Sequence, residues 1–136
     1  AWFLKDINSL EGDVEEVLDL YFRQCSILVD CSDLARIGMF LATKGITEAG
    51  IPLISAQSVR LATTFMVTCG MYNASGEFAI QVGIPAKSGV SGGILGVVPG
   101  RYGVATFGPA LDKKGNSVVG IRMLRHLSQV LELSIF

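Results

Sequence analysis

The residues with the clearest chemical potential lie in one glycine-rich segment, KSGVSGG at residues 87–93. Lys87 supplies a cation and Ser88 a hydroxyl, and the glycines that follow leave the backbone bare enough for a ligand to approach it closely. Exposed N–H groups on such a backbone stabilise an oxyanion, the charge that develops when a carbonyl is attacked. A glycine-rich bulge at the start of a strand explains the same residues without any function, and both interpretations stay open.

Tyr72 is the second candidate, in the sequence CGMY at residues 69–72. Gly70 predicts a turn that fixes the tyrosine at the end of a helix. A tyrosine in such a place acts as a general acid or base when a nearby cation lowers its pKa, and we expect Lys87 to lie near it. The alternative is a packed aromatic side chain with a satisfied hydroxyl. The same alternative holds for Tyr21, which lies on a helical stripe among residues expected in the core.

The remaining motifs point away from metals and cofactors. His126 is the only histidine, so the chain alone does not assemble a multi-histidine zinc site, and we expect His126 on the surface. The three cysteines lack C-x-x-C spacing, and neither a G-x-x-x-x-G-K-[ST] loop nor a G-x-G-x-x-G motif after a strand occurs. We therefore predict no metal site and no cofactor, and we expect reduced cysteines in a cytoplasmic protein.

A lysine–hydroxyl–glycine strand also belongs to enzymes whose nucleophile is the serine of an S-x-x-K motif. No serine of this chain has a lysine three residues later. The chain also begins at Ala1 rather than Met, in a stretch that resembles the interior of an element. We therefore expect the nucleophile to lie outside this chain, in a missing N-terminal part of the parent protein. On that basis the chain alone is expected to be inactive.

Hydrophobic periodicity and turn residues predict the elements that position these groups. The expected helices cover residues 13–25, 31–44, 56–68, 74–82 and 117–131, with an extended segment at 85–90 and strands at 92–98 and 102–107. The expected helix caps are Asp13, Ser32, Ser55, and Asn116 or Ser117. This order predicts an α+β fold with helices packed on an antiparallel sheet. We expect residues 1–70 to end a helical subdomain and residues 71–136 to form the C-terminal part of a sheet subdomain with its terminal helix.

Composition narrows the classes of function. Half of the 136 residues are hydrophobic and 17% are charged, so the chain can bury a core and is not a disordered protein. A net charge of −1 gives no basic footprint for nucleic acid. No apolar run approaches the roughly 18–20 residues of a membrane span. Residues 1–33 carry eight acidic and two basic side chains, which predicts an acidic helix surface or a self-complementary contact between subunits.

Several separated stretches resemble the serine-dependent glutaminases, in that family's order. They are DVEEVLDLYFRQCSILV at residues 13–29, CGMY at 69–72, PAKSGVSGGILGVVP at 85–99, LD at 111–112 and GNSV at 115–118. The resemblance implies the fold of β-lactamases and penicillin-binding proteins, and hydrolysis of L-glutamine to L-glutamate and ammonia. In that family the S-x-x-K serine forms a glutamyl-enzyme that water hydrolyses. That serine and its lysine would lie upstream of Ala1.

The resemblance also implies roles for five residues. Tyr21 resembles the tyrosine that contacts the substrate, and Tyr72 resembles the tyrosine beside the nucleophile that helps to move its proton. Val90 resembles the residue whose backbone N–H completes the oxyanion hole and so binds the substrate. Lys87 and Ser88 resemble the lysine–hydroxyl pair that supports the site electrostatically. The implied partners are L-glutamine, the missing N-terminal half and further copies of the same protein.

One departure from the family pattern is Asn73, which stands where the family commonly has Asp and removes a charge beside Tyr72. Two other functions stay open. One is another active-serine acyl enzyme of the penicillin-binding or β-lactamase type. The other is a non-catalytic interaction module that has kept the fold. An assay of the complete protein with nitrocefin and with glutamine as substrates distinguishes another acyl enzyme from a glutaminase. The absence of an S-x-x-K motif in the parent gene would favour the interaction module.

Overall fold

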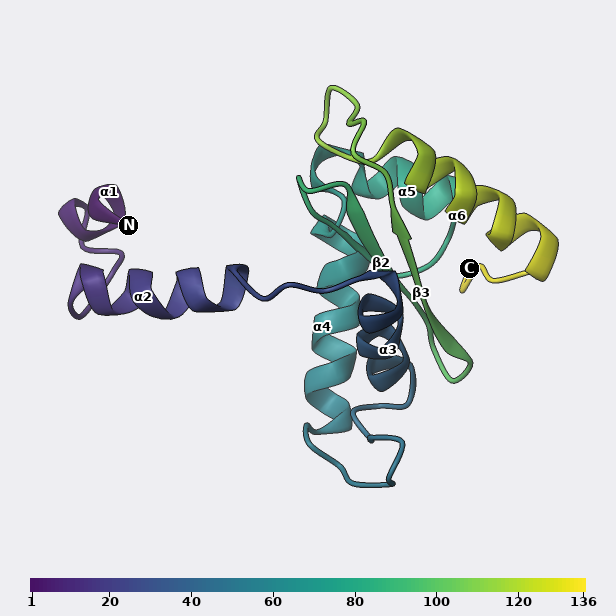
Figure 1. Ribbon diagram of the computed structural model, residues 1–136, viewed down its shortest axis with the longest axis horizontal. Helices are drawn as coiled ribbons and strands as arrows, with labels where there is room; N and C mark the ends of the chain where they lie inside the picture. The colour runs from purple at the N-terminus through teal and green to yellow at the C-terminus, as the bar shows by residue number, and fades with distance from the viewer.

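The computed structural model describes all 136 residues and shows helices on both faces of a small antiparallel sheet (Figure 1). The predicted α+β class is therefore confirmed. None of the helices combines the length and the apolar character that a bilayer crossing needs. In chain order the elements are α1 (Trp2–Asp6), α2 (Val14–Cys25), α3 (Cys31–Ala42), α4 (Ala56–Cys69), η1 (Tyr72–Ala74), α5 (Ser75–Gln81), β1 (Ala86–Ser88), β2 (Gly93–Val98), β3 (Tyr102–Phe107) and α6 (Val118–Leu131).

The register of the sheet decides which side chains share a face. The strands lie in the order β1-β2-β3, and both neighbouring pairs are antiparallel. Ser88 is paired with Ile94, and Ile94 with Thr106, so these three side chains point to one face. The neighbouring pair in the register is Lys87 and Leu95. Because adjacent residues of a strand alternate between faces, both of these side chains point to the opposite face.

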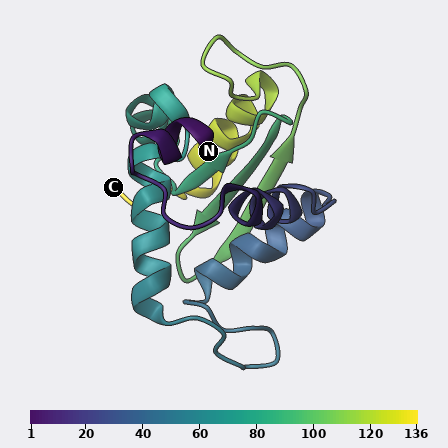
Figure 2. The ribbon, with the colours of Figure 1, turned by 90° about the vertical axis from the view of Figure 1, so that its left-hand side faces the viewer.

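Two helices cover these two faces at points of close approach. A Cβ added to Gly120 of α6 would lie 2.8 Å from Thr106 Oγ1, so α6 covers the Ile94 face. A Cβ added to Gly38 of α3 would lie 2.9 Å from the Cα of Gly103 in β3, so α3 covers the Leu95 face. The strands run between these helices (Figure 2). The larger apolar core lies on the α6 side and comprises Met71, Ala74, Phe78, Val82, Ile84, Ala86, Ile94, Val98, Leu124 and Leu133.

Residues 1–25 form an arm, α1 and α2, that extends away from the body of the molecule (Figure 1). Asp13 caps α2 as predicted, since its carboxylate accepts the backbone N–H of Glu15 and of Glu16, each at 3.0 Å. The apolar stripe of this helix is not part of the core. Val14 is the only buried residue of α2, and Tyr21 is 60% exposed. The prediction that placed Tyr21 among core residues is therefore wrong, because α2 lies outside the body.

The cap of α3 also differs from the prediction. Asp30, not Ser32, caps this helix, and the Asp30 carboxylate accepts the Asp33 N–H at 2.9 Å. The Asp33 carboxylate in turn accepts the Asp30 N–H at 3.3 Å. This reciprocal pair satisfies two backbone donors at once, and it starts the helix two residues before a Ser32 cap would.

The other predicted elements are confirmed with small changes. The β2–β3 hairpin is present, and Ser55 caps α4 through the N–H of Ser58 at 3.0 Å. Ser117, rather than Asn116, caps α6 through the N–H of Gly120 at 3.1 Å. The helix expected at 74–82 is divided into η1 and α5, and the extended segment expected at 85–90 contains only the three residues of β1.

Candidate active site

Tyr72 lies just after α4 in a backbone conformation that residues with a Cβ rarely adopt. Its φ of 53° is in the left-handed region. Ser75 holds this turn, because its hydroxyl accepts the Met71 N–H at 3.0 Å and donates to the Tyr72 carbonyl at 2.8 Å. Tyr72 is 41% exposed, so its ring is not packed in the core and is accessible to a ligand.

Gly70 joins the Tyr72 turn to strand β1. The Ser88 N–H donates to the Gly70 carbonyl at 3.0 Å. A Cβ at Gly70 would lie 1.9 Å from the carbonyl oxygen of Ala86, so only glycine allows the end of α4 to lie this close to β1. The contact brings together two segments that are separate in the sequence.

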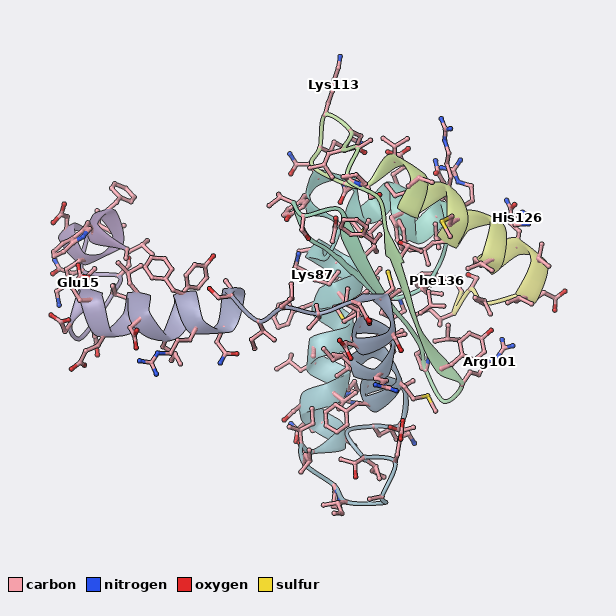
Figure 3. All side chains as sticks on the ribbon, viewed as in Figure 1. Glu15, Lys87, Arg101, Lys113, His126 and Phe136 are labelled. Atoms are coloured by element: carbon pink, nitrogen blue, oxygen red, sulfur yellow. The ribbon has the colours of Figure 1, made fainter.

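Lys87 lies beside Tyr72, as expected from the sequence. Its Nζ is 4.8 Å from the centroid of the Tyr72 ring and also donates to the carbonyl of Ser88. A cation over the face of an aromatic ring is attracted by the negative charge of that face. Figure 3 shows Lys87 on the side of the body from which the arm extends. The structure thus forms a cation–phenol pair at an open surface.

Val90 lies in the loop between β1 and β2. The Gly89 N–H donates to the Gly93 carbonyl at 2.9 Å, and the Gly92 N–H donates to the Gly89 carbonyl at 3.0 Å, so the loop closes on itself. Gly92 has a φ of 97°, which this tight loop needs. The Val90 N–H donates to no acceptor in the chain, and Val90 is 72% exposed. This loop therefore leaves the backbone N–H groups of Val90 and Ser91 free to bind an oxygen atom.

Ser88 does not share the exposed face of Lys87. Adjacent residues of a strand point to opposite faces, and β1 alternates between buried Ala86, exposed Lys87 and buried Ser88. Ser88 is 1% exposed, and its hydroxyl has no hydrogen-bond partner in the chain. The structure therefore connects the Lys87 ammonium with the Ser88 carbonyl, while the Ser88 hydroxyl is directed toward the interior.

Tyr21 is the one predicted site residue that the structure does not bring to the others. It lies on α2 in the arm, whereas Tyr72, Lys87 and Val90 belong to the body (Figure 1). The pKa of the Tyr21 phenol is raised above its ordinary value. The largest cause is a hydrogen bond with the Cys25 side chain, and the next is the electrostatic effect of that same side chain.

The structure also shows residues around Tyr72 that the sequence patterns did not identify. Asn116 is fully buried, and its Nδ2 donates to the carbonyl of Met71 at 3.2 Å. The Asp112 carboxylate accepts the Asn116 N–H at 3.0 Å. No pattern in the sequence indicates which distant carbonyl a buried amide will reach.

A salt bridge ties this loop to α5. Lys114 Nζ lies 2.9 Å from the Glu77 carboxylate, and this hydrogen bond, with the charge of Lys114, lowers the pKa of Glu77 below its ordinary value. The larger hollows of the molecule lie elsewhere. One of about 670 Å³ is lined by Leu41, Arg60 and Pro99 among others, and another of about 620 Å³ by Ile37, Phe40 and Leu53 among others; Tyr72, Lys87 and Val90 line neither.

Comparisons with known proteins cover the whole chain. The family model described as Glutaminase matches residues 1–136. A glutaminase of Alkaliphilus oremlandii is 59% identical over the full chain, which spans 45% of that relative. A glutaminase of Clostridioides difficile is 60% identical over the full chain, which spans 44% of that relative. The chain thus spans less than half the length of the curated relatives it matches.

A solved structure shows the same fold. The glutaminase YbgJ of Bacillus subtilis, in a covalent complex with 5-oxo-L-norleucine, superimposes with a TM-score of 0.94 at 45% identity. The match covers 99% of this chain and 49% of that protein. The arrangement of helices and strands is therefore the β-lactamase-like fold of these glutaminases. A whole-chain match to the family model and relatives at this level of identity establish that the chain belongs to the glutaminase family.

Proposed function

We propose that the chain is the C-terminal portion of an enzyme that hydrolyses L-glutamine to L-glutamate and ammonia. The match of the whole chain to the glutaminase family model carries this proposal. The exposed pair of Tyr72 and Lys87 and the free N–H of Val90 support it, because amide hydrolysis needs a proton carrier and an oxyanion donor. The nucleophile in this proposal is the serine of an S-x-x-K motif in the segment that precedes this chain.

The proposed reaction has two steps. The serine oxygen attacks the side-chain amide carbon of glutamine, and the serine proton is transferred to the leaving nitrogen. The carbon–nitrogen bond then breaks, ammonia leaves, and a glutamyl ester remains. Water adds to that ester, its proton returns to the serine oxygen, and glutamate is released. The covalent complex of the Bacillus subtilis relative with 5-oxo-L-norleucine supports a covalent route, since that ligand resembles glutamine with a methyl group in place of the amide nitrogen.

Tyr72 is the residue that we propose to move the proton. Its ring is accessible at the surface of the body, and the Lys87 ammonium lies 4.8 Å from the ring centroid. A positive charge at that distance favours the negatively charged phenolate, which can accept the serine proton and then, as the neutral phenol, donate it to the leaving nitrogen. Lys87 therefore acts by electrostatics in this proposal, and the histidine-free site needs no other base from this chain.

Val90 and Tyr21 are the residues that we propose to bind the substrate. The Val90 N–H donates to no acceptor in the chain, and it would contribute to the oxyanion hole together with the N–H of the nucleophile. Tyr21 would contact the substrate together with Tyr72. Because the arm holds Tyr21 away from the body, this role requires the remainder of the enzyme to complete the site.

Ser88 has a more indirect role in this proposal. Its hydroxyl is buried without a partner, and its carbonyl accepts from Lys87. We propose that Ser88 supports the site by fixing the Lys87 ammonium through that carbonyl.

Three further proposals concern the protein as a whole. We propose that a helical subdomain ends at residue 70 and that a sheet subdomain follows it. We propose a cytoplasmic location, which suits three free, exposed cysteines. We also propose that the protein assembles into homo-oligomers through exposed apolar side chains.

The test compares the chain alone with a full-length chimera. In the chimera, the matching 137 residues of the Clostridioides difficile relative are replaced by this chain. We expect no ammonia from glutamine with the chain alone, because it has no S-x-x-K serine, and turnover with the chimera. The unmodified relative is the control.

Two outcomes would contradict the proposal. One is release of ammonia by the homogeneous 136-residue chain alone. The other is a chimera that has the circular dichroism spectrum and melting behaviour of the relative but no glutamine turnover. A chimera that hydrolyses nitrocefin instead of glutamine would favour a penicillin-binding or β-lactamase-like enzyme, and a folded chimera inert to both would favour an interaction module.

A further inference from the structure

The left-handed backbone of Tyr72 requires the surrounding structure to hold it. A residue with a Cβ at a φ of 53° lies in a sparsely populated conformation that persists only when neighbouring groups determine it. Ser75 supplies two hydrogen bonds from within the turn itself. Further contacts come from the loop at residues 112–116, including a hydrogen bond between residues that are 45 positions apart in the sequence.

Asn116 is the closest link between that loop and the turn. Its side chain is fully buried and donates to the carbonyl of Met71, the residue immediately before Tyr72, at 3.2 Å. Its Oδ1 is buried without a partner, so the side chain is held by its donor alone. Because the Met71 carbonyl belongs to the peptide unit that includes the Tyr72 nitrogen, this hydrogen bond restrains the φ of Tyr72 directly.

Gly115 places the loop backbone beside the Tyr72 ring. A Cβ built on Gly115 would lie 3.7 Å from Tyr72 Cε2 and 3.8 Å from Cδ2. Lys87 of β1 also borders the ring, since its Nζ lies 4.8 Å from the ring centroid. The ring is therefore bordered by a backbone segment and a cation, and both limit its orientation.

Asp112 keeps the loop rigid. Its Oδ1 accepts the Lys114 N–H at 2.8 Å and the Asn116 N–H at 3.0 Å. The backbone closes the same loop, with the Asp112 N–H donating to the Asn116 carbonyl at 2.8 Å and the Gly115 N–H donating to the Asp112 carbonyl at 3.1 Å. A rigid loop of this kind can impose a conformation on a neighbouring turn rather than follow it.

We propose that Asn116 and Asp112 are positioning residues for Tyr72. Asn116 holds the Met71 carbonyl, Asp112 holds Asn116, and together they fix the phenol for proton transfer. This inference rests on the proposed role of Tyr72 in glutamine hydrolysis. Neither residue touches the substrate in it, so their loss should lower kcat and leave KM almost unchanged.

The first test is a double-mutant cycle in the chimera. Asn116→Asp keeps the shape of the side chain and removes its donor, and we expect kcat to fall roughly 10- to 100-fold, as for a misplaced catalytic group. In a Tyr72→Phe background the same change should lower kcat by less than about threefold, since coupled residues are not additive. An equal loss in both backgrounds, or no loss in either, would overturn the proposal.

A second pair of variants changes Asp112, which is half-buried rather than fully buried like Asn116, so misfolding is less of a concern. Asp112→Ala removes the acceptor and should lower kcat about tenfold or more, whereas Asp112→Asn keeps an oxygen acceptor and should restore most of the activity. Lys113→Ala is the matched control, because Lys113 points away from the body at the tip of the loop (Figure 3). Equal losses for Asp112→Ala and Asp112→Asn would contradict positioning through this acceptor.

A third measurement needs no activity and so separates this inference from the proposed function. In the 136-residue chain, the nuclear Overhauser effect between the amide and α protons of Tyr72 reports its left-handed φ, because these two protons lie closer together at positive φ than at negative φ. Asn116→Asp and Asp112→Ala should weaken this effect and move the Tyr72 ring shifts toward averaged values, and Lys113→Ala should do neither. Unchanged Tyr72 signals in both loop variants would overturn the inference even if glutamine turnover were established.

Discussion

Tyr72 has a backbone conformation that glycine adopts more easily, which indicates that this position needs the tyrosine side chain. Its φ of 53° costs a residue with a Cβ about 1–3 kcal/mol, and glycine would avoid that cost. The accessible phenol beside the Lys87 ammonium is the feature that glycine lacks. A strained tyrosine at an open surface, next to a cation, is the arrangement expected when the hydroxyl rather than the packing is needed.

Replacing that hydroxyl is the most direct test at the scale of one residue. In the chimera we expect Tyr72→Phe to lower kcat for glutamine at least about 100-fold, because a positioned general acid or base contributes roughly 10²–10⁴-fold. Ammonia release under saturating glutamine measures the effect. Tyr102→Phe is the matched control, since Tyr102 also lies beside a cation, Arg101, but in β3. A Tyr72→Phe enzyme with nearly normal kcat would show that the phenol does not move the proton.

The sequence predicted some of these residue contacts and not others. The proximity of Tyr72 and Lys87 followed from two motifs and was confirmed. The opposite orientation of Ser88 follows from strand alternation, whereas a lysine–hydroxyl motif does not indicate which face of the strand its hydroxyl takes. The bond from Asn116 to Met71 spans 45 residues, and only the fold brings such groups together.

At the scale of elements, α3 and β3 depend on glycine for their contact. A Cβ on Gly103 would lie 2.1 Å from the Ala35 carbonyl oxygen and 2.2 Å from the Met39 nitrogen. Both are backbone atoms of α3, so no side chain can move aside to make room. The helix packs directly on the strand, and this packing covers the Leu95 face of the sheet.

Gly103→Ala should therefore destabilise the body of the molecule. We expect the free energy of unfolding to fall by about 1–3 kcal/mol or more, as for overpacking of a tight contact. Gly76→Ala in α5 is the matched control, since its Cβ would meet nothing within 4 Å and alanine favours a helix by roughly 0.5–1 kcal/mol. Urea unfolding followed by circular dichroism measures both. Similar midpoints for the two variants would refute this account of the α3–β3 contact.

Periodicity located most elements correctly and failed where a choice between neighbouring caps was needed. Ser32 was a reasonable cap by residue type, but Asp30 and Asp33 form a reciprocal pair that satisfies more donors. The periodic apolar residues of α2 predicted an amphipathic helix, and the helix is present. Its placement in the core was wrong, because periodicity shows which face is apolar and not what covers it.

At the scale of the whole molecule, the arm and the body differ in how they are stabilised. The body has a shared core on the α6 side of the sheet. The arm has a helix of 12 residues whose apolar stripe is exposed, and isolated helices of that length are marginal in water. The molecule should therefore unfold in two stages, with the arm first.

Hydrogen exchange tests this difference. In the chain alone, amides of residues 1–30 should exchange almost as fast as in an unfolded peptide, while those of α4, β2 and β3 stay protected. In the chimera, the amides of α2 should become protected as the rest of the enzyme completes the site around Tyr21. Protection of α2 equal to that of α4 in the chain alone would show that the arm is stable without further contacts.

The structure of the loop around Val90 determines which substitutions this position can accept. Its proposed contribution is a backbone N–H, and the conformation of that N–H is set by the glycine contacts on either side. The valine side chain, 72% exposed, is nearly irrelevant to that contribution. Mutation can therefore change the identity of this residue while its chemistry persists, with proline as the exception because it removes the donor. A functional position of this kind leaves its record in the flanking glycines rather than in its own side chain.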